Sequence, residues 1–115
     1  LWLARAGRPD EAISAYVEAL ADGIDVLELR YNLGGLLRRA GRHAEAVPHL
    51  AAATELAPGD PDARIELGLS LQAMGRFDEA IESFEAAIAL APDSAESREH
   101  LPRLIEDAKR GRAAN

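Results

Sequence analysis

The feature that most constrains the fold of this chain is a repeat of 34 residues. Glycine recurs at Gly7, Gly41 and Gly75, which are two steps of 34 residues each. The same step links further small, large apolar or helix-ending residues: Gly34 and Gly68; Ala12, Ala46 and Ala80; Tyr16, Leu50 and Phe84; Ala19, Ala53 and Ala87; Pro58 and Pro92. Such a period predicts similar supersecondary units that stack, because one unit cannot bury its apolar faces alone.

The sequence of each repeat unit predicts two short amphipathic helices joined by a tight turn. In residues 61–94, Asp60 can cap the first helix and Pro61 suits its first position. Gly75 ends that helix, because glycine adopts the left-handed conformation at little cost. The second helix ends before Pro92. Apolar residues recur at helical spacing along one face of each helix: Leu67, Leu71 and Met74, then Ala80, Ile81, Phe84, Ala87 and Ile88.

The spacing resembles that of the tetratricopeptide repeat family over essentially the whole chain. In that family the first helix carries Trp, Leu-Gly and Tyr, and the second carries Ala and Phe and is followed by Pro. The matching residues are Leu67-Gly68, Leu71, Ala80, Phe84 and Pro92, and in the preceding copy Leu33-Gly34, Leu37, Ala46, Leu50 and Pro58. The departures are Arg64 and Arg30 in the Trp column, and Leu71 and Leu37 in the Tyr column. The resemblance implies an all-α fold, a right-handed superhelical solenoid of antiparallel helix pairs.

The 115 residues predict one domain with five parts. These are a truncated first repeat (1–26), a second repeat (27–60), a third repeat (61–94), a capping helix (95–110) and a frayed tail (111–115). Residues 1–6 would be the end of a first helix, and the start at Leu1 rather than Met indicates a fragment or processed form. An excess of arginine over lysine weakly indicates a bacterial source.

Four local features carry further expectations. Asp25, with Glu28 three residues later, is expected to cap the next helix. Pro48 lies near the start of a helix and should not break it. Asp93 and Ser94 should cap the last helix. Pro102 lies inside that helix, so a kink is expected near residues 100–101.

The composition and motifs argue against several functional classes. The net charge of −7 argues weakly against a nucleic-acid or anionic-membrane surface. No apolar run approaches the roughly 20 residues that span a bilayer, and the chain has no cysteine. His43, His49 and His100 have no second ligand at metal-binding spacing. We therefore expect no enzyme activity, metal or cofactor; the compartment stays open, with the cytoplasm favoured.

What remains is a surface. In the resembled family the first helices line the concave side, and the residues left for that side here are Glu28, Tyr31, Asn32, Gly35, Arg38 and Arg39, then Asp62, Ile65, Glu66, Leu69, Gln72 and Ala73. We expect this side to bind a peptide or partner protein, with apolar anchors on Tyr31, Ile65 and Leu69. Arg38 and Arg39 would form a basic edge, and Glu28, Asp62 and Glu66 an acidic one.

The resembled family includes other binding modes, and two of them fit this sequence poorly. A clamp for a C-terminal carboxylate, known in this family, has an asparagine where Asn32 stands, but Asp62 and Glu66 would repel the carboxylate. Other members of the family carry a row of asparagines along the groove. Asn32 would fit such a row, but Glu66 stands where a further asparagine would be needed. The alternative function is a structural spacer or self-assembly segment of a larger, possibly enzymatic protein. A homodimer could then form through the concave face or through the N-terminal edge, where Ile13 and Tyr16 would be partly uncovered.

Overall fold

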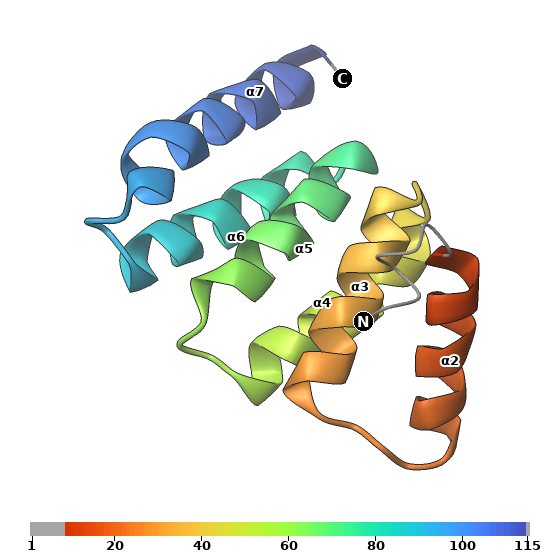
Figure 1. Cartoon of the computed structure of the whole chain (residues 1–115). Coiled ribbons are helices and arrows are strands. Elements are labelled where there is room, and N and C mark those ends of the chain that lie inside the picture. Colours follow the sequence, from red (N-terminus) through yellow and green to blue (C-terminus); the bar gives the residue numbers. More distant parts are fainter. Residues whose placement is uncertain (1–8, 115) are drawn as a thin grey trace.

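The computed structural model describes residues 9–114, and in this part of the chain helices joined by short connections are the only regular secondary structure. Its elements are α2 (Pro9–Ala21), α3 (Leu27–Arg39), α4 (His43–Leu56), α5 (Pro61–Ala73), α6 (Phe77–Leu90), a π-helical turn η1 (Glu96–His100) and α7 (Leu101–Ala114). Helices α3 and α4, and then α5 and α6, form antiparallel pairs stacked between α2 and α7 (Figure 1). The predicted fold class, an all-α superhelical solenoid, is confirmed. The helix and turn expected within residues 1–8 lie outside the described residues.

The turns within the helix pairs are made as the glycine repeat predicts. Gly41 and Gly75 have φ angles of +80° and +78°. In each turn the residue after the glycine donates its N–H back into the helix, from Arg42 to the Leu37 carbonyl at 2.8 Å and from Arg76 to the Leu71 carbonyl at 2.9 Å. A side chain at either glycine would strain this left-handed backbone.

Small residues let the two helices of each pair approach closely. A Cβ atom on Gly34 would lie 2.5 Å from the side chain of Leu50, and one on Gly68 would lie 2.5 Å from the ring of Phe84. Leu50 and Phe84 are fully buried. Leu67 packs against both apolar clusters, so the repeats share one continuous core.

Two of the predicted helix caps are present and one is wrong. The Asp60 carboxylate accepts the N–H of Asp62 at 2.9 Å, and the Ser94 hydroxyl accepts the N–H of Ser97 at 3.1 Å. Helix α3 starts after Val26 without a side-chain cap. Asp25 binds the guanidinium of Arg30 instead, because a two-bond ion pair is stronger than one bond to a backbone N–H.

The C-terminal helix differs from its expected form. The irregularity expected near Pro102 is a π-helical turn, in which the N–H of Leu101 donates to the Glu96 carbonyl. Helix α7 continues to Ala114, beyond the expected end at residue 110. Contacts with α6 hold this end, since Gly111 lies against the ring of Phe77 and Arg112 pairs with Asp78 at 2.8 Å. Pro48 leaves α4 unbroken, as predicted.

A group of three side chains joins the α2–α3 loop to α4. Arg30 donates from Nε to Asp25 at 2.8 Å, and its Nη1 lies 2.9 Å from Nδ1 of His49. Since a guanidinium can only donate, His49 accepts and is neutral in this arrangement. Burial lowers the pKa of His49, and the charge of Arg30 lowers it further, against opposing contributions from Glu45 and Asp25.

We therefore expect His49 to make the fold less stable in mild acid. Its folded-state pKa lies below the unfolded value of about 6.5, so the unfolded chain binds more protons as the pH falls. The stabilising contribution is full above about pH 6.5 and is lost as the pH drops through the folded pKa. Thermal unfolding on both sides of this window should show a larger fall in Tm for the wild type than for His49→Gln, which keeps an acceptor without titrating. Equal falls would contradict this role of His49.

Candidate binding face

The residues assigned to the concave side all lie on α3 and α5, which contact each other along the stack (Figure 1). Helix α7 continues the series, because the segment that contains it begins one 34-residue step after α5. We call the exposed side of α3, α5 and α7 the candidate face. Its side chains differ in their surroundings, and these differences decide what the face can bind.

An ion pair between Arg38 and Glu66 ties α3 to α5. The Nε of Arg38 donates to one carboxylate oxygen of Glu66, and its Nη2 lies 3.5 Å from the other. The two side chains are only 23% and 15% exposed, so water screens this pair less than a surface pair. The prediction of separate basic and acidic edges is therefore wrong for these two residues, because their charges neutralise each other.

Tyr31 lies on α3 in a negatively charged setting. Its side chain is partly buried, and burial is the main reason that its pKa is raised. Three carboxylates raise that pKa further: Glu66, Asp62 and Asp60. The charge of Arg39 opposes them. The exposed part of this tyrosine is thus an aromatic surface near the carboxylates at the start of α5.

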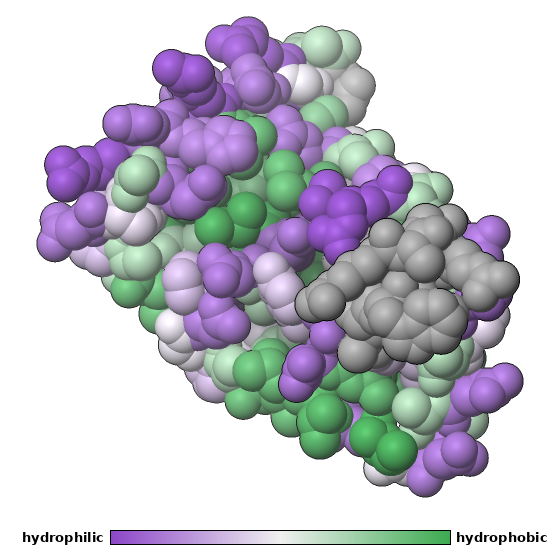
Figure 2. All heavy atoms as spheres, viewed as in Figure 1, coloured by the Kyte–Doolittle hydropathy of each residue, from purple (hydrophilic) through white to green (hydrophobic). Residues whose placement is uncertain are grey.

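Ile65 and Leu69 form an apolar stripe on α5. Both pack against the buried cluster around Phe84 and yet remain partly exposed, as does Leu104 of α7. The space-filling view shows an apolar surface between α7 and the α5–α6 pair (Figure 2). Ile65 and Leu69 therefore contribute to both the core and the surface.

Glu28 and Asn32 lie toward α2 rather than beside the apolar stripe. Together with Tyr16, Val26 and Leu29 they line a shallow hollow of about 220 Å³. Burial raises the pKa of Tyr16, and the nearby charge of Glu28 raises it further, while a side-chain hydrogen bond with Asn32 lowers it. The predicted residues therefore divide between this hollow and the surface of α3 and α5 around the ion pair.

Two further predicted residues complete the face. Arg39 is exposed, and its guanidinium lies beside Gly35 in the same helix. Gln72 is partly buried near the end of α5. Arg39 is the basic residue of the predicted edge that stays without an ion pair to any described residue.

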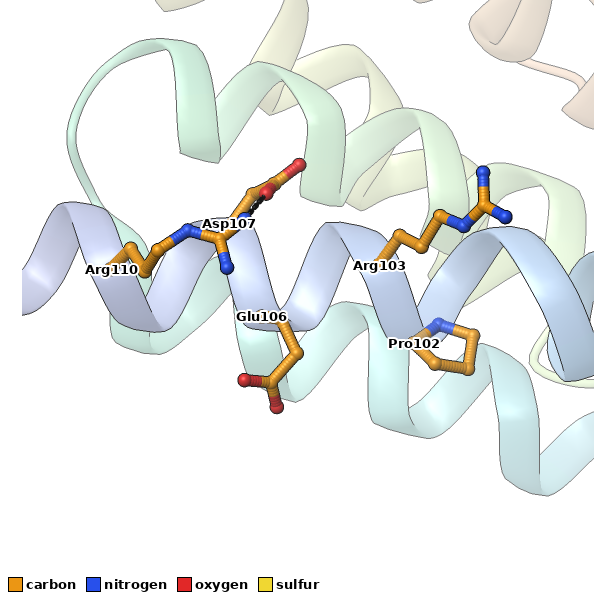
Figure 3. Close-up of a pocket in the computed structure, with 5 residues that line it drawn as sticks. All are labelled: Pro102, Arg103, Glu106, Asp107 and Arg110. Carbon is orange, nitrogen blue, oxygen red and sulfur yellow. Dashed lines mark hydrogen bonds and ion pairs between the residues drawn. The ribbon is translucent and has the colours of Figure 1, made fainter.

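Helix α7, the last helix of the stack, carries many exposed polar residues. A shallow hollow of about 380 Å³ on this helix is lined by Pro102, Arg103, Glu106, Asp107 and Arg110. Figure 3 shows that Arg110 reaches Asp107, while Glu106 points away from that pair. A polar surface of this kind suits the terminal unit of a solenoid, and the capping role of this helix stays a prediction.

The contribution of α7 to the candidate face was missed in the sequence. One 34-residue step from Ile65 leads to Glu99, and one step from Leu69 leads to Arg103. Both residues are exposed on the final helix. The repeat that identified the other residues could therefore have located these two.

Within residues 9–114 no group of three His, Cys, Asp or Glu side chains is arranged to hold a metal ion. None of the described helices is both long and apolar enough to cross a membrane. The candidate face thus offers apolar, aromatic and charged contacts.

Comparison with protein families gives two overlapping matches. Both are to models described as tetratricopeptide repeat, over residues 37–101 and residues 3–61. No curated protein sequence matches the chain.

Solved structures with the same fold cover nearly the whole chain. MamA 41-end from Desulfovibrio magneticus RS-1 is 23% identical with a TM-score of 0.82, over 97% of this chain and 67% of that one. YrrB, described as a TPR protein with an unusual peptide-binding site, is 27% identical with a TM-score of 0.78, over 96% of this chain and 64% of that one. The first TPR domain of human RPAP3 is 21% identical with a TM-score of 0.82, over 98% of this chain and 88% of that one.

Proposed function

The chain belongs to the tetratricopeptide repeat family, and from this premise we propose that it is an interaction module whose candidate face binds a peptide segment of a partner protein. The observation that carries the proposal is the stripe of Ile65 and Leu69, apolar side chains that stay partly exposed although they adjoin the core. The similarity to YrrB, a relative with a peptide-binding site, supports the same class of ligand.

The face suits a peptide for physical reasons. Ile65 and Leu69 are four residues apart on α5 and so lie on the same side of the helix, where apolar side chains of a ligand can cover both. Tyr31 adds an aromatic side chain that is already partly ordered by burial, which lowers the entropic cost of binding. A few such anchors carry most of the energy of a typical interface.

Binding is proposed in preference to end-to-end self-assembly because of the last helix. Helix α7 exposes a row of charged side chains: Glu106, Asp107 and Arg110. Stacking another copy on this surface would desolvate these charges without apolar contacts to offset the cost. The charged C-terminal end therefore disfavours stacking of a second copy there, and the candidate face is the surface we propose for binding.

The test is a selection from a displayed library of random peptides. We expect the wild type to enrich a defined set of sequences, and Ile65→Ser/Leu69→Ser to bind those sequences at least about tenfold more weakly. The matched control is Leu56→Ser/Leu90→Ser, which removes two apolar side chains that are 49% and 40% exposed at the ends of α4 and α6. This control should bind like the wild type.

Circular dichroism and thermal unfolding must show that each variant is folded at the assay temperature. Leu69→Gln, a milder change on the same stripe, replaces the double variant if the latter is unfolded. No enrichment on the wild type, or equal enrichment on the folded stripe variant, would overturn the proposal.

A further inference from the structure

We infer that the peptide held by the candidate face is basic, with lysine or arginine next to its apolar residues. This inference rests on the proposed function and adds the chemistry of the partner. It follows from the ion pairs on this face and from the position of Tyr31.

The first step is the balance of charges that remain free. Arg38 is neutralised by Glu66 across the α3–α5 contact. Three exposed carboxylates on α3, α5 and η1 make no ion pair with another described residue: Glu28, Asp62 and Glu99. Two exposed arginines at positions that the 34-residue step assigns to this face are similarly unpaired: Arg39 and Arg103. The free charge on the face is therefore negative, in keeping with the net charge of −7 for the whole chain.

The second step is where this negative charge lies relative to the apolar stripe. Asp62 precedes Ile65 by three residues, and Leu69 follows Ile65 by four, so the three side chains run along one side of α5. A ligand that covers Ile65 and Leu69 would therefore also lie next to the carboxylate of Asp62. A cationic side chain at that point would complete the contact.

The third step is the aromatic ring beside that carboxylate. Tyr31 and Asp62 lie on the contacting helices α3 and α5, the charge of Asp62 contributes to the raised pKa of Tyr31, and the ring is partly exposed. A cation placed between Asp62 and the ring would gain both a charge pair and a cation–π contact. An acidic ligand side chain would meet repulsion at the same place. The occupant that fits is a peptide with a cation near its apolar anchors.

The helix dipole accounts for the presence of free carboxylates on this face. Glu28 and Asp62 lie in the first turns of α3 and α5, where negative charge is favourable. Glu99 likewise lies in the first turn of its helix, η1. What distinguishes Asp62 is its position next to the apolar stripe, where it can contact a ligand that covers Ile65 and Leu69.

The experiment uses the peptides selected on the wild type and two variants of equal net charge. Glu28→Gln/Asp62→Asn removes two carboxylates from the candidate face. Glu82→Gln/Glu85→Gln removes two exposed carboxylates from α6, away from that face. We expect enriched peptides to carry lysine or arginine, to bind the face variant about tenfold more weakly, and to bind the α6 variant like the wild type. Their affinity should fall as salt is added.

The outcomes separate this inference from the proposed function. Enriched peptides that are acidic or uncharged would overturn the inference and leave peptide binding intact. Equal losses in the two variants would also overturn it, because net charge rather than the candidate face would then attract the ligand. A selection that enriches nothing on the wild type would instead overturn the proposed function.

Discussion

Replacing Phe84 with alanine is expected to lower the free energy of unfolding by about 3–5 kcal/mol, the usual cost of removing a buried aromatic side chain. Phe84 is fully buried in α6, and its ring lies directly over Gly68 of α5. No side chain at Gly68 can move in to fill the space, so the cavity stays largely open. The same cluster supports Ile65 and Leu69 from beneath, which links this residue to the candidate face.

Phe77→Ala serves as the matched control for Phe84→Ala. Phe77 is also on α6 but is only partly buried, against Gly111 of α7. Denaturation by urea, followed by circular dichroism, should therefore show a clearly smaller loss for Phe77→Ala than for Phe84→Ala. Equal losses would mean that the core is not concentrated at the contact of Gly68 with Phe84.

Alanine at Gly34 should leave the chain less stable than alanine at Gly35 by about 1–3 kcal/mol, the cost of overpacking a core. The new Cβ at Gly34 would lie 2.5 Å from both Cγ and Cδ2 of Leu50, a fully buried side chain. At Gly35 the nearest atom is Nη2 of Arg39 at 3.6 Å, an ordinary contact with an exposed side chain.

The two glycines are adjacent in the same helix, so the comparison removes the effect of helix propensity. Alanine stabilises a helix interior by about 1 kcal/mol relative to glycine, and both variants share this gain. We therefore expect Gly35→Ala to match or exceed the wild type in urea denaturation, and Gly34→Ala to fall below Gly35→Ala. Identical midpoints for the two variants would contradict the close approach of α3 and α4.

The repeat predicted the features that depend on spacing alone. It located the left-handed glycines at Gly41 and Gly75, the cap at Asp60, and the contact of Gly68 with its partner helix. These features recur because the two helices of each repeat pack against each other through similar residues at equivalent positions. The positions of the helices and their buried faces could therefore be predicted from the sequence alone.

The features that the sequence did not predict depend on which side chains of different helices come within bonding distance of each other. Arg38 meets Glu66 across 28 positions rather than 34, an offset set by how α3 and α5 lie against each other. Asp25 could cap a helix or bind Arg30, and the stronger two-bond pair prevails. The extension of α7 past Gly111 depends on Phe77 and on the Asp78–Arg112 pair, which no local propensity encodes.

For the candidate face, the sequence indicated the residues but not their surroundings. It assigned Tyr31, Ile65 and Leu69 to one side of the stack, in agreement with their partial exposure. It left open which charges stay free, because ion pairing depends on the geometry between helices. The Arg38–Glu66 pair is the example, because it joins two residues that the sequence had assigned to opposed edges.

Calorimetric titration of one selected peptide into three proteins tests the central claim most directly. The proteins are the wild type, the folded stripe variant at Ile65 and Leu69, and the control variant at Leu56 and Leu90. Binding through the candidate face predicts equal affinities for the wild type and the control, and an affinity at least about tenfold weaker for the stripe variant. Unchanged affinity in the stripe variant, or a loss confined to the control, would show that the peptide binds elsewhere.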